Sequence, residues 1–151
     1  GEHVPVGVMI ETPAACMIAD LLAKEADFFS IGPNDLTQYI LAADRGNPQV
    51  EYLYSVYHPA VLRAIQHVIA CAKQQNIPVG MCGESAADPA LAPLLVSFGL
   101  DEYSVTPRSV LEVRANLAQW NQTEADAVAT HAMALDTAEA VREYLQGCVK
   151  A

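Results

Sequence analysis

The chain contains four short runs of residues with the pattern of β-strands, separated by longer segments with helical periodicity. The runs are Val4–Ile10, Phe28–Ile31, Ile77–Met81 and Glu102–Val105. The first is apolar apart from glycine and Pro5, which is typical of a strand buried on both faces. The pattern therefore predicts four strands joined by connections long enough for a crossover helix.

Helix signals fill the segments between these runs. Thr12 can cap a helix with Pro13 in its first position, running to about Leu22. Another helix is expected from Pro59, after His58, to about Gln75. The remaining expected helices begin near Asp35 and end at Leu41, begin at Pro89 after an Asp88 cap and end at Phe98, and cover Pro107–Trp120, Thr123–Leu135 and Thr137–Val149.

Alternating strands and helices predict the α/β class, with a parallel sheet and helices outside it. Two architectures fit this order. One is an open doubly wound sheet; the other is the C-terminal half of a (β/α)8 barrel, since a complete barrel needs eight strands and about 250 residues. The hydrophobic fraction of 52% predicts that residues 1–151 form one compact domain.

Charge and cysteine content narrow the possible partners. A formal net charge of −10 is the wrong sign for binding nucleic acid or anionic lipid. The four cysteines show no CxxC pair, which favours reduced thiols in the cytoplasm. No stretch approaches the roughly 18 apolar residues of a membrane span, and the first residues lack the pattern of a signal peptide, so we expect a cytoplasmic protein without membrane contact.

Candidate chemistry lies where the predicted strands end, because parallel α/β folds bind ligands at the carboxyl ends of their strands. Glu11 follows the first run and Asn34-Asp35 follow the second. Taken singly, Glu11 could be a solvated rim carboxylate and Asp35 an ordinary first-turn aspartate. Two carboxylates on successive strand ends suit Mg²⁺, which keeps positions for water and substrate oxygens.

Cys82 follows the third run and precedes Gly83. A core cysteine is the alternative interpretation, and it is preferred for Cys16 and Cys71 on the apolar faces of helices. At a strand end, beside a glycine that lets the backbone approach a ligand, the thiol suits a proton donor or a nucleophile.

Residues 44–57 form an irregular connection that is long enough to be functional. Within it, Arg45 offers a planar donor fork that matches phosphate. The alternative is a weak surface salt bridge with Asp44. We expect the tyrosines of this segment to pack it against neighbouring helices: Tyr52, Tyr54 and Tyr57.

Three motifs bring these residues together: IETPAA around Glu11, DFFSIGPNDLTQYILAADRGN over residues 27–47, and GMCGE over residues 80–84. With them, nearly the whole chain closely resembles the C-terminal part of enzyme I of the phosphoenolpyruvate-dependent sugar phosphotransferase system, including the multiphosphoryl transfer proteins. The NDLTQ and CGE segments recur among phosphoenolpyruvate-utilising enzymes in general. NDLTQY followed by DRGN favours enzyme I over the dikinase and synthase branches.

The resemblance implies half of a homodimeric (β/α)8 barrel that binds phosphoenolpyruvate and Mg²⁺. The phosphoryl group would pass to a histidine on a separate N-terminal domain and then to a histidine-containing phosphocarrier protein, leaving pyruvate. By position, Glu11 and Asp35 would ligate Mg²⁺, Asn34 would contact the substrate and Arg45 would hold its phosphate. Cys82 would donate the proton.

The chain departs from the sequence pattern of enzyme I at one position, and two alternative functions remain open. Pro33 replaces the usual threonine or serine, which removes a hydroxyl and a backbone N–H beside Asn34. The histidine domain and the upstream arginines of the barrel are absent from these residues, so we expect the chain alone to be inactive. The alternatives are the barrel of a pyruvate phosphate dikinase or phosphoenolpyruvate synthase and, for this segment alone, a non-catalytic dimerisation module with unpaired strand edges.

Overall fold

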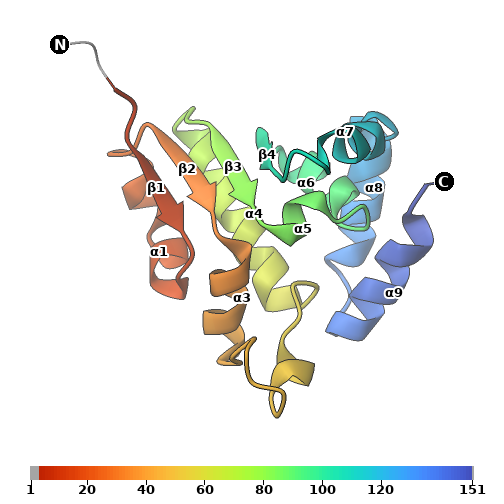
Figure 1. The fold of residues 1–151 in the computed structure, drawn as a ribbon. Coiled ribbons are helices and arrows are strands. Elements are labelled where there is room, and N and C mark those ends of the chain that lie inside the picture. The colour runs from red at the N-terminus through yellow and green to blue at the C-terminus, as the bar shows by residue number, and fades with distance from the viewer. Residues whose placement is uncertain (1–3, 151) are drawn as a thin grey trace.

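The computed structural model describes residues 4–150, in which four strands form one parallel sheet (Figure 1). They are β1 (Gly7–Ile10), β2 (Phe28–Ile31), β3 (Val79–Cys82) and β4 (Glu102–Ser104), paired in that order. A doubly wound sheet reverses its strand order at a switch point, whereas here each strand pairs with the next along the chain. The α/β prediction is confirmed, with the strand order of a (β/α)8 half-barrel.

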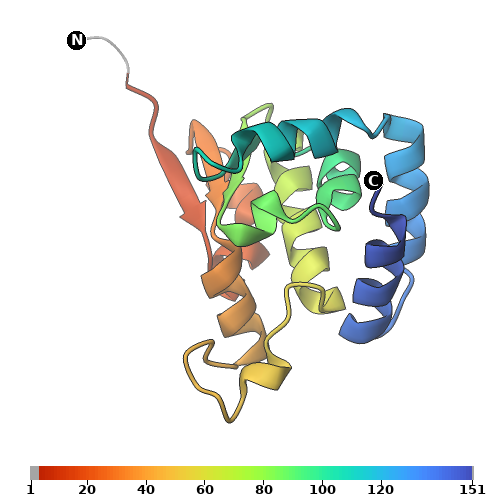
Figure 2. The same cartoon turned by 45° about the vertical axis from the view of Figure 1, so that its right-hand side comes forward.

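The helices of the described residues follow the strands as crossover connections, and two more close the chain. Their bounds are α1 (Pro13–Met17), α2 (Ala19–Leu22), α3 (Pro33–Leu41), α4 (Pro59–Gln74), α5 (Glu84–Ala87), α6 (Ala92–Phe98), α7 (Val110–Ala118), α8 (Gln122–Ala132) and α9 (Ala138–Cys148), with one turn of 3-10 helix, η1 (Glu51–Leu53). Figure 2 shows α8 and α9 side by side at the C-terminal side of the molecule.

Only one face of the sheet is buried within the described part of the chain. Side chains that face the helices are at most 1% exposed: Ile10, Phe29, Ile31, Val79 and Met81. On the other face, Met9 is 46% exposed and Phe28 is 38% exposed. The prediction of strands buried on both faces was therefore wrong for this segment, because the inner face of a barrel is covered by strands from its other half.

The first βα unit is shorter than the sequence pattern predicts. Residues Val4 to Val6 are exposed and precede β1, which begins at Gly7 after Pro5, a residue without a backbone N–H. Thr12 caps the following helix as predicted, because its Oγ1 accepts a hydrogen bond from Ala15 N at 3.2 Å. The helix is then interrupted at Ile18, where φ is −112° and ψ is 21°.

The connection that follows β3 differs more from the sequence prediction than the first one does. The helix predicted from Pro89 begins at Ala92, and residues Glu84–Ala87 form the separate helix α5. Asp88 has extended backbone, and its Oδ1 accepts a hydrogen bond from Ala90 N at 2.9 Å, so it closes a local turn instead of capping a long helix. Pro107 likewise lies within a turn, closed by the hydrogen bond from Ser109 N to Thr106 O at 2.9 Å, and α7 begins at Val110.

The carboxyl ends of the strands lie near the start of α3 and the segment 42–58, at the bottom of Figure 1. This segment projects below the sheet in both views (Figures 1 and 2). Its C-terminal end leads into α4, where His58 Nδ1 accepts a hydrogen bond from Ala60 N at 3.1 Å. Among residues 4–150 no helix has the length and apolar character needed to cross a bilayer.

Candidate active site at the carboxyl end of the sheet

Glu11 and Cys82, two of the residues predicted from the sequence, lie at the same level at the ends of their strands, in one row across the sheet. Ile10 pairs with Ile31 and Ile31 with Met81, so the next residues, Glu11, Gly32 and Cys82, continue the row. The N–H of Gly32 donates to Ile10 O at 3.1 Å and extends the ladder to this level. Ser104 is the register partner of Cys82 and completes the row.

Gly32 leaves room in this row for the side chain of Glu11. A Cβ on Gly32 would lie only 2.8 Å from Glu11 Oε2 and 2.9 Å from Glu11 Cβ. The carboxylate of Glu11 therefore lies across the end of β2. Gly32 is also the N-cap of α3, whose first turn contains Asp35, so both predicted metal ligands border the same junction.

The donor set at this junction has the chemistry of a hard-cation site. Mg²⁺ is typically held by one or two carboxylates, with water and substrate oxygens in the remaining positions. Glu11 and Asp35, both half-buried, supply two such carboxylates. Among residues 4–150 no group of three or more His, Cys, Asp and Glu side chains is arranged to hold a metal ion.

Cys82 is the last residue of β3, and its thiol points across the sheet. Its Sγ lies 3.5 Å from Ile31 O, to which it donates. Cys82 is half-buried, whereas Cys16 and Cys71 are each 4% exposed, as predicted for core cysteines. Burial raises the pKa of Cys16 to about 11, so that thiol is poorly suited to proton transfer near neutral pH.

Gly83 brings the end of β3 against the start of α3. Its φ of 80° and ψ of −175° lie in a region that only glycine adopts readily. A Cβ at this position would lie 3.4 Å from Asn34 Nδ2, so the amide of Asn34 sits beside the Gly83 backbone. The first turn of α3, which contains Asn34, is therefore in contact with the residue that follows Cys82.

Arg45 reaches back to α3 from the irregular segment. Its Nη2 lies 3.5 Å from Asp35 Oδ1, and its backbone N–H donates to Gln38 Oε1 at 3.1 Å. Asp44 instead accepts a hydrogen bond from Gly46 N at 2.8 Å. The alternative of an Arg45–Asp44 surface pair is therefore wrong, since the guanidinium pairs with the predicted metal ligand Asp35.

Tyr54 fixes the same segment to α3 at a second point. Its hydroxyl donates to Asn34 O at 3.2 Å. Burial raises the pKa of Tyr54, and the charge and hydrogen bond of Arg45 oppose that rise. The phenol is therefore a neutral donor at neutral pH, and Tyr54 does more than fill space between helices.

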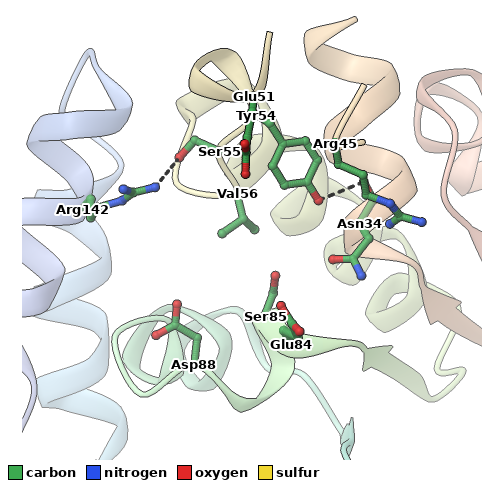
Figure 3. A pocket seen from close by; sticks show the side chains of 10 residues that line it. All are labelled: Asn34, Arg45, Glu51, Tyr54, Ser55, Val56, Glu84, Ser85, Asp88 and Arg142. Atoms are coloured by element: carbon green, nitrogen blue, oxygen red, sulfur yellow. Dashed lines mark hydrogen bonds between the residues drawn. The ribbon is translucent and has the colours of Figure 1, made fainter. Parts of the chain in front are cut away.

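A cavity of about 520 Å³ opens beside Asn34, Arg45 and Tyr54, and its lining does not include Glu11, Asp35 or Cys82 (Figure 3). Arg45 and Asn34 stand on one side of it, and Arg142 of α9 stands on the other. The rest of its lining is Glu51, Tyr54, Ser55, Val56, Glu84, Ser85 and Asp88. The Arg45 guanidinium offers donors to an anion in a domain whose net charge is −10.

Pro33 fits the local geometry without the hydroxyl it replaces. It occupies the first position of α3, where a backbone N–H has no helical partner, and Gly32 before it provides no side-chain cap. Pro33 O accepts a hydrogen bond from Thr37 Oγ1 at 2.6 Å, within the same helix. The substitution therefore keeps Asn34 and Asp35 in the first turn of the helix.

Sequence reasoning missed three residues around the site: Tyr54, Ser104 and Arg142. Ser104 could have been found by extending the strand register from Cys82, because both end their strands. The positions of Tyr54 and Arg142 depend on the path of the irregular segment and on the docking of α9. No periodic signal in the sequence carries that information.

Comparison with known proteins agrees with this architecture. Residues 1–122 match the model of the PEP-binding domain of PEP-utilising enzymes. The match covers most of the chain and includes all four strands. The chain therefore belongs to this family of phosphoenolpyruvate-binding α/β domains.

Curated relatives extend the similarity to α9. Proteins named phosphoenolpyruvate-protein phosphotransferase are 50% identical over 145 residues in Bacillus sp. (strain S) and 49% identical over 145 residues in Geobacillus stearothermophilus, covering 96% of this chain and 25% of each relative. The Bacillus subtilis (strain 168) protein of the same name is 43% identical over 149 residues, which is 99% of this chain and 26% of that protein. The chain thus spans about a quarter of the length of these relatives.

Proposed function

We propose that this chain is the C-terminal half of the barrel in a phosphoenolpyruvate-protein phosphotransferase. Its part in that enzyme is to bind phosphoenolpyruvate and to protonate the enolpyruvate left when the phosphoryl group departs. The observation that carries the proposal is that Glu11 and Cys82 meet the end of β2, Glu11 at Gly32 and the Cys82 thiol at Ile31 O, beside the Arg45–Asp35 pair. The shared name of the relatives favours this function over a dikinase or a synthase.

Each residue has a distinct role in this proposal. Arg45 binds the phosphate through its guanidinium fork, and Asn34 fixes the substrate beside Gly83. Glu11 and Asp35 hold Mg²⁺, which when bound stabilises the negative charge that develops on the enolate. The charges support this division, because two carboxylates would offset the charge of a divalent cation and a guanidinium would offset that of a phosphate.

Cys82 completes the reaction as a general acid. Breaking the phosphorus–oxygen bond transfers the phosphoryl group to a histidine nitrogen of another domain and leaves the enolate of pyruvate. The Cys82 thiol gives its proton to carbon three of that enolate, which forms pyruvate, and the resulting thiolate recovers a proton from solvent. The half-buried position of Cys82 supports this role, because Cys82 is not sealed in the core as Cys16 and Cys71 are.

The proposal extends to partners outside the chain. We infer that the phosphohistidine passes its phosphoryl group to a histidine-containing phosphocarrier protein in sugar uptake, that the protein works in the cytoplasm and that it is a homodimer. Four free cysteines suit a reducing compartment. Exposed apolar side chains on α1 and α2, with Met17 77% and Leu21 52% exposed, are the type of surface that a partner covers.

The test is pyruvate release from phosphoenolpyruvate by the full-length protein that contains this chain, with Mg²⁺ and a phosphocarrier protein. Cys82→Ala should lower kcat by about 10²- to 10⁴-fold, the usual contribution of a general acid. Cys148→Ala, at another half-buried cysteine, is the matched control and should keep full activity. Equal turnover of the wild-type protein and Cys82→Ala would reject the role of the thiol, and no turnover by the wild-type protein would reject the function.

A further inference from the structure

Arg142 of α9 contacts the far end of the segment that carries Arg45. Its Nη2 donates to Ser55 Oγ at 3.4 Å (Figure 3). Its guanidinium carbon lies 5.1 Å from the centre of the Tyr57 ring. Arg142 lies beyond residues 1–122, the part of the chain that matches the family model. One wall of the cavity is therefore built by the closing helices.

Tyr57 connects this arginine to the third βα connection. Tyr57 is 8% exposed, and its hydroxyl donates to Asp88 Oδ2. The second carboxylate oxygen of Asp88 is also occupied, since it accepts from Ala90 N at 2.9 Å. Arg142, Tyr57 and Asp88 thus form one linked set, which we call the rear clamp.

The segment 44–58 is held from two sides. On the α3 side, Arg45 contacts Asp35 and Gln38, and the Tyr54 hydroxyl contacts Asn34 O. On the other side, the rear clamp includes Tyr57 and holds Ser55 through Arg142, three residues and one residue after Tyr54. Between Arg45 and Tyr54 the backbone makes short-range turns, such as Leu53 N to Val50 O at 2.9 Å. The rear clamp therefore limits how far Tyr54 and Arg45 can move from Asn34 and Asp35.

We propose that Arg142 is a positioning residue for phosphate binding: through Ser55 and Tyr57 it holds the segment 44–58 so that Arg45 stays beside Asp35 at the substrate cavity. This inference rests on the proposed function for its link to phosphoenolpyruvate. The geometry of the clamp itself does not depend on that function. Arg142 is not a catalytic residue in this account, because Asn34 and Arg45 stand on the opposite side of the cavity.

Charge at the clamp favours arginine over other residues. The cavity lining includes Glu51, Glu84 and Asp88, so a cation at position 142 offsets negative charge. A guanidinium can stack on an aromatic ring and donate to a hydroxyl at the same time, whereas a lysine ammonium satisfies the two contacts less well. Arg142→Lys should therefore retain part of the effect.

The experiment uses the full-length protein that contains this chain and compares Arg142→Gln, Arg142→Lys and Tyr57→Phe. Arg114→Gln is the matched control, because Arg114 lies exposed on α7 and outside the cavity lining. Losing a cation–π contact at a partly exposed site should raise KM for phosphoenolpyruvate roughly two- to fivefold in Arg142→Gln, with kcat unchanged. Arg142→Lys should fall between Arg142→Gln and the wild type.

Hydrogen–deuterium exchange of the same proteins gives a readout that needs no turnover. Arg142→Gln and Tyr57→Phe should speed exchange of peptides from residues 44–56 and leave the strand peptides unchanged. Unaltered KM and unaltered exchange in Arg142→Gln would overturn the inference, as would faster exchange throughout the molecule, which indicates general destabilisation. If the wild-type protein does not use phosphoenolpyruvate, the proposed function fails, and exchange in residues 44–56 alone decides whether Arg142 holds the segment.

Discussion

Arg45 Nη2 lies 3.5 Å from Asp35 Oδ1, which joins the proposed phosphate ligand to a proposed metal ligand. Both side chains are substantially exposed, at 46% and 40%, so the pair contributes little to the stability of the fold. Its importance is in positioning. A guanidinium held beside the carboxylate is already placed for a phosphate that would bridge cation and arginine.

Replacing Arg45 with lysine should separate charge from geometry. Arg45→Lys keeps the positive charge but loses the planar fork, so we expect KM for phosphoenolpyruvate to rise about tenfold, with a smaller change in kcat. Steady-state kinetics of pyruvate release measures both constants. Wild-type KM in Arg45→Lys would show that the fork does not hold the phosphate.

Gly32→Ala should disturb the metal site through Glu11. The added Cβ would lie 2.8 Å from Glu11 Oε2, so the carboxylate must move away from the end of β2. We expect weaker Mg²⁺ binding by calorimetry and a loss of about 1–3 kcal/mol in the free energy of unfolding from overpacking.

Gly147→Ala is the matched control for Gly32→Ala. A Cβ on Gly147, in helix α9, would meet no atom within 4 Å. This change should leave Mg²⁺ binding intact and raise the free energy of unfolding by about 0.5–1 kcal/mol, because alanine favours the helix. Undiminished Mg²⁺ affinity in Gly32→Ala would argue against Glu11 as a ligand.

Alkylation should separate the four cysteines by burial. Cys16 is 4% exposed and burial raises its pKa to about 11, so N-ethylmaleimide at about pH 8 should modify it at least roughly tenfold more slowly than Cys82. Peptide mapping of the folded protein measures each rate. Phosphoenolpyruvate with Mg²⁺ should protect Cys82 and leave Cys148 reactive; equal rates with and without substrate would place Cys82 outside the site.

Asp101 should make the fold sensitive to acid. Its carboxylate accepts hydrogen bonds from Lys73 Nζ and, at 2.9 Å, from Val79 N at the start of β3. Burial raises the pKa of Asp101, but the Lys73 and Val79 contacts outweigh it and hold the pKa below its usual value. A lowered pKa in the folded state gives stability that is full above the ordinary aspartate pKa and is lost as the pH falls toward the folded value.

The Asp101→Asn variant tests this dependence. Its Tm should fall less than the wild-type Tm between about pH 5 and about pH 3, because the ionisable group is gone. Lys73→Met, which removes the charged partner, should likewise reduce the change in Tm over the same pH interval. Parallel Tm curves for the wild type and Asp101→Asn would show that Asp101 does not contribute to the acid response.

The sequence was sufficient to place the strand-end residues, because the rule that sites lie at the carboxyl ends of parallel strands depends only on strand order. Glu11 and Cys82 fall in one row for that reason. A parallel sheet with outer helices was also predictable, since each strand is followed by a crossover helix, whereas the choice of a half-barrel over a doubly wound sheet came from the family resemblance. Exposure of Met9 and Phe28 was not, because the apolar character of a barrel strand reflects burial by the whole barrel.

The contacts of residues in or beside irregular segments could not be predicted from the sequence. The pairing of Arg45 with Asp35 depends on Ala42, whose φ of 49° turns the chain at the end of α3, and on the Gln38 side chain that holds the Arg45 backbone. The contact of Arg142 with Tyr57 joins elements far apart in the sequence. Such contacts are set by how irregular segments fold back, and local patterns do not encode this path.

The most direct test of the central claim, that Glu11 and Asp35 form a divalent-cation site for phosphoenolpyruvate, is paramagnetic broadening by Mn²⁺ in nitrogen-15 NMR spectra of this chain. Mn²⁺ accepts the same carboxylate ligands as Mg²⁺. With phosphoenolpyruvate present, amide signals of residues 11–12, 32–36 and 82–83 should broaden first, and Glu11→Gln and Asp35→Asn should each abolish the selectivity. Broadening spread evenly over the acidic surface, or unchanged in both variants, would contradict the account.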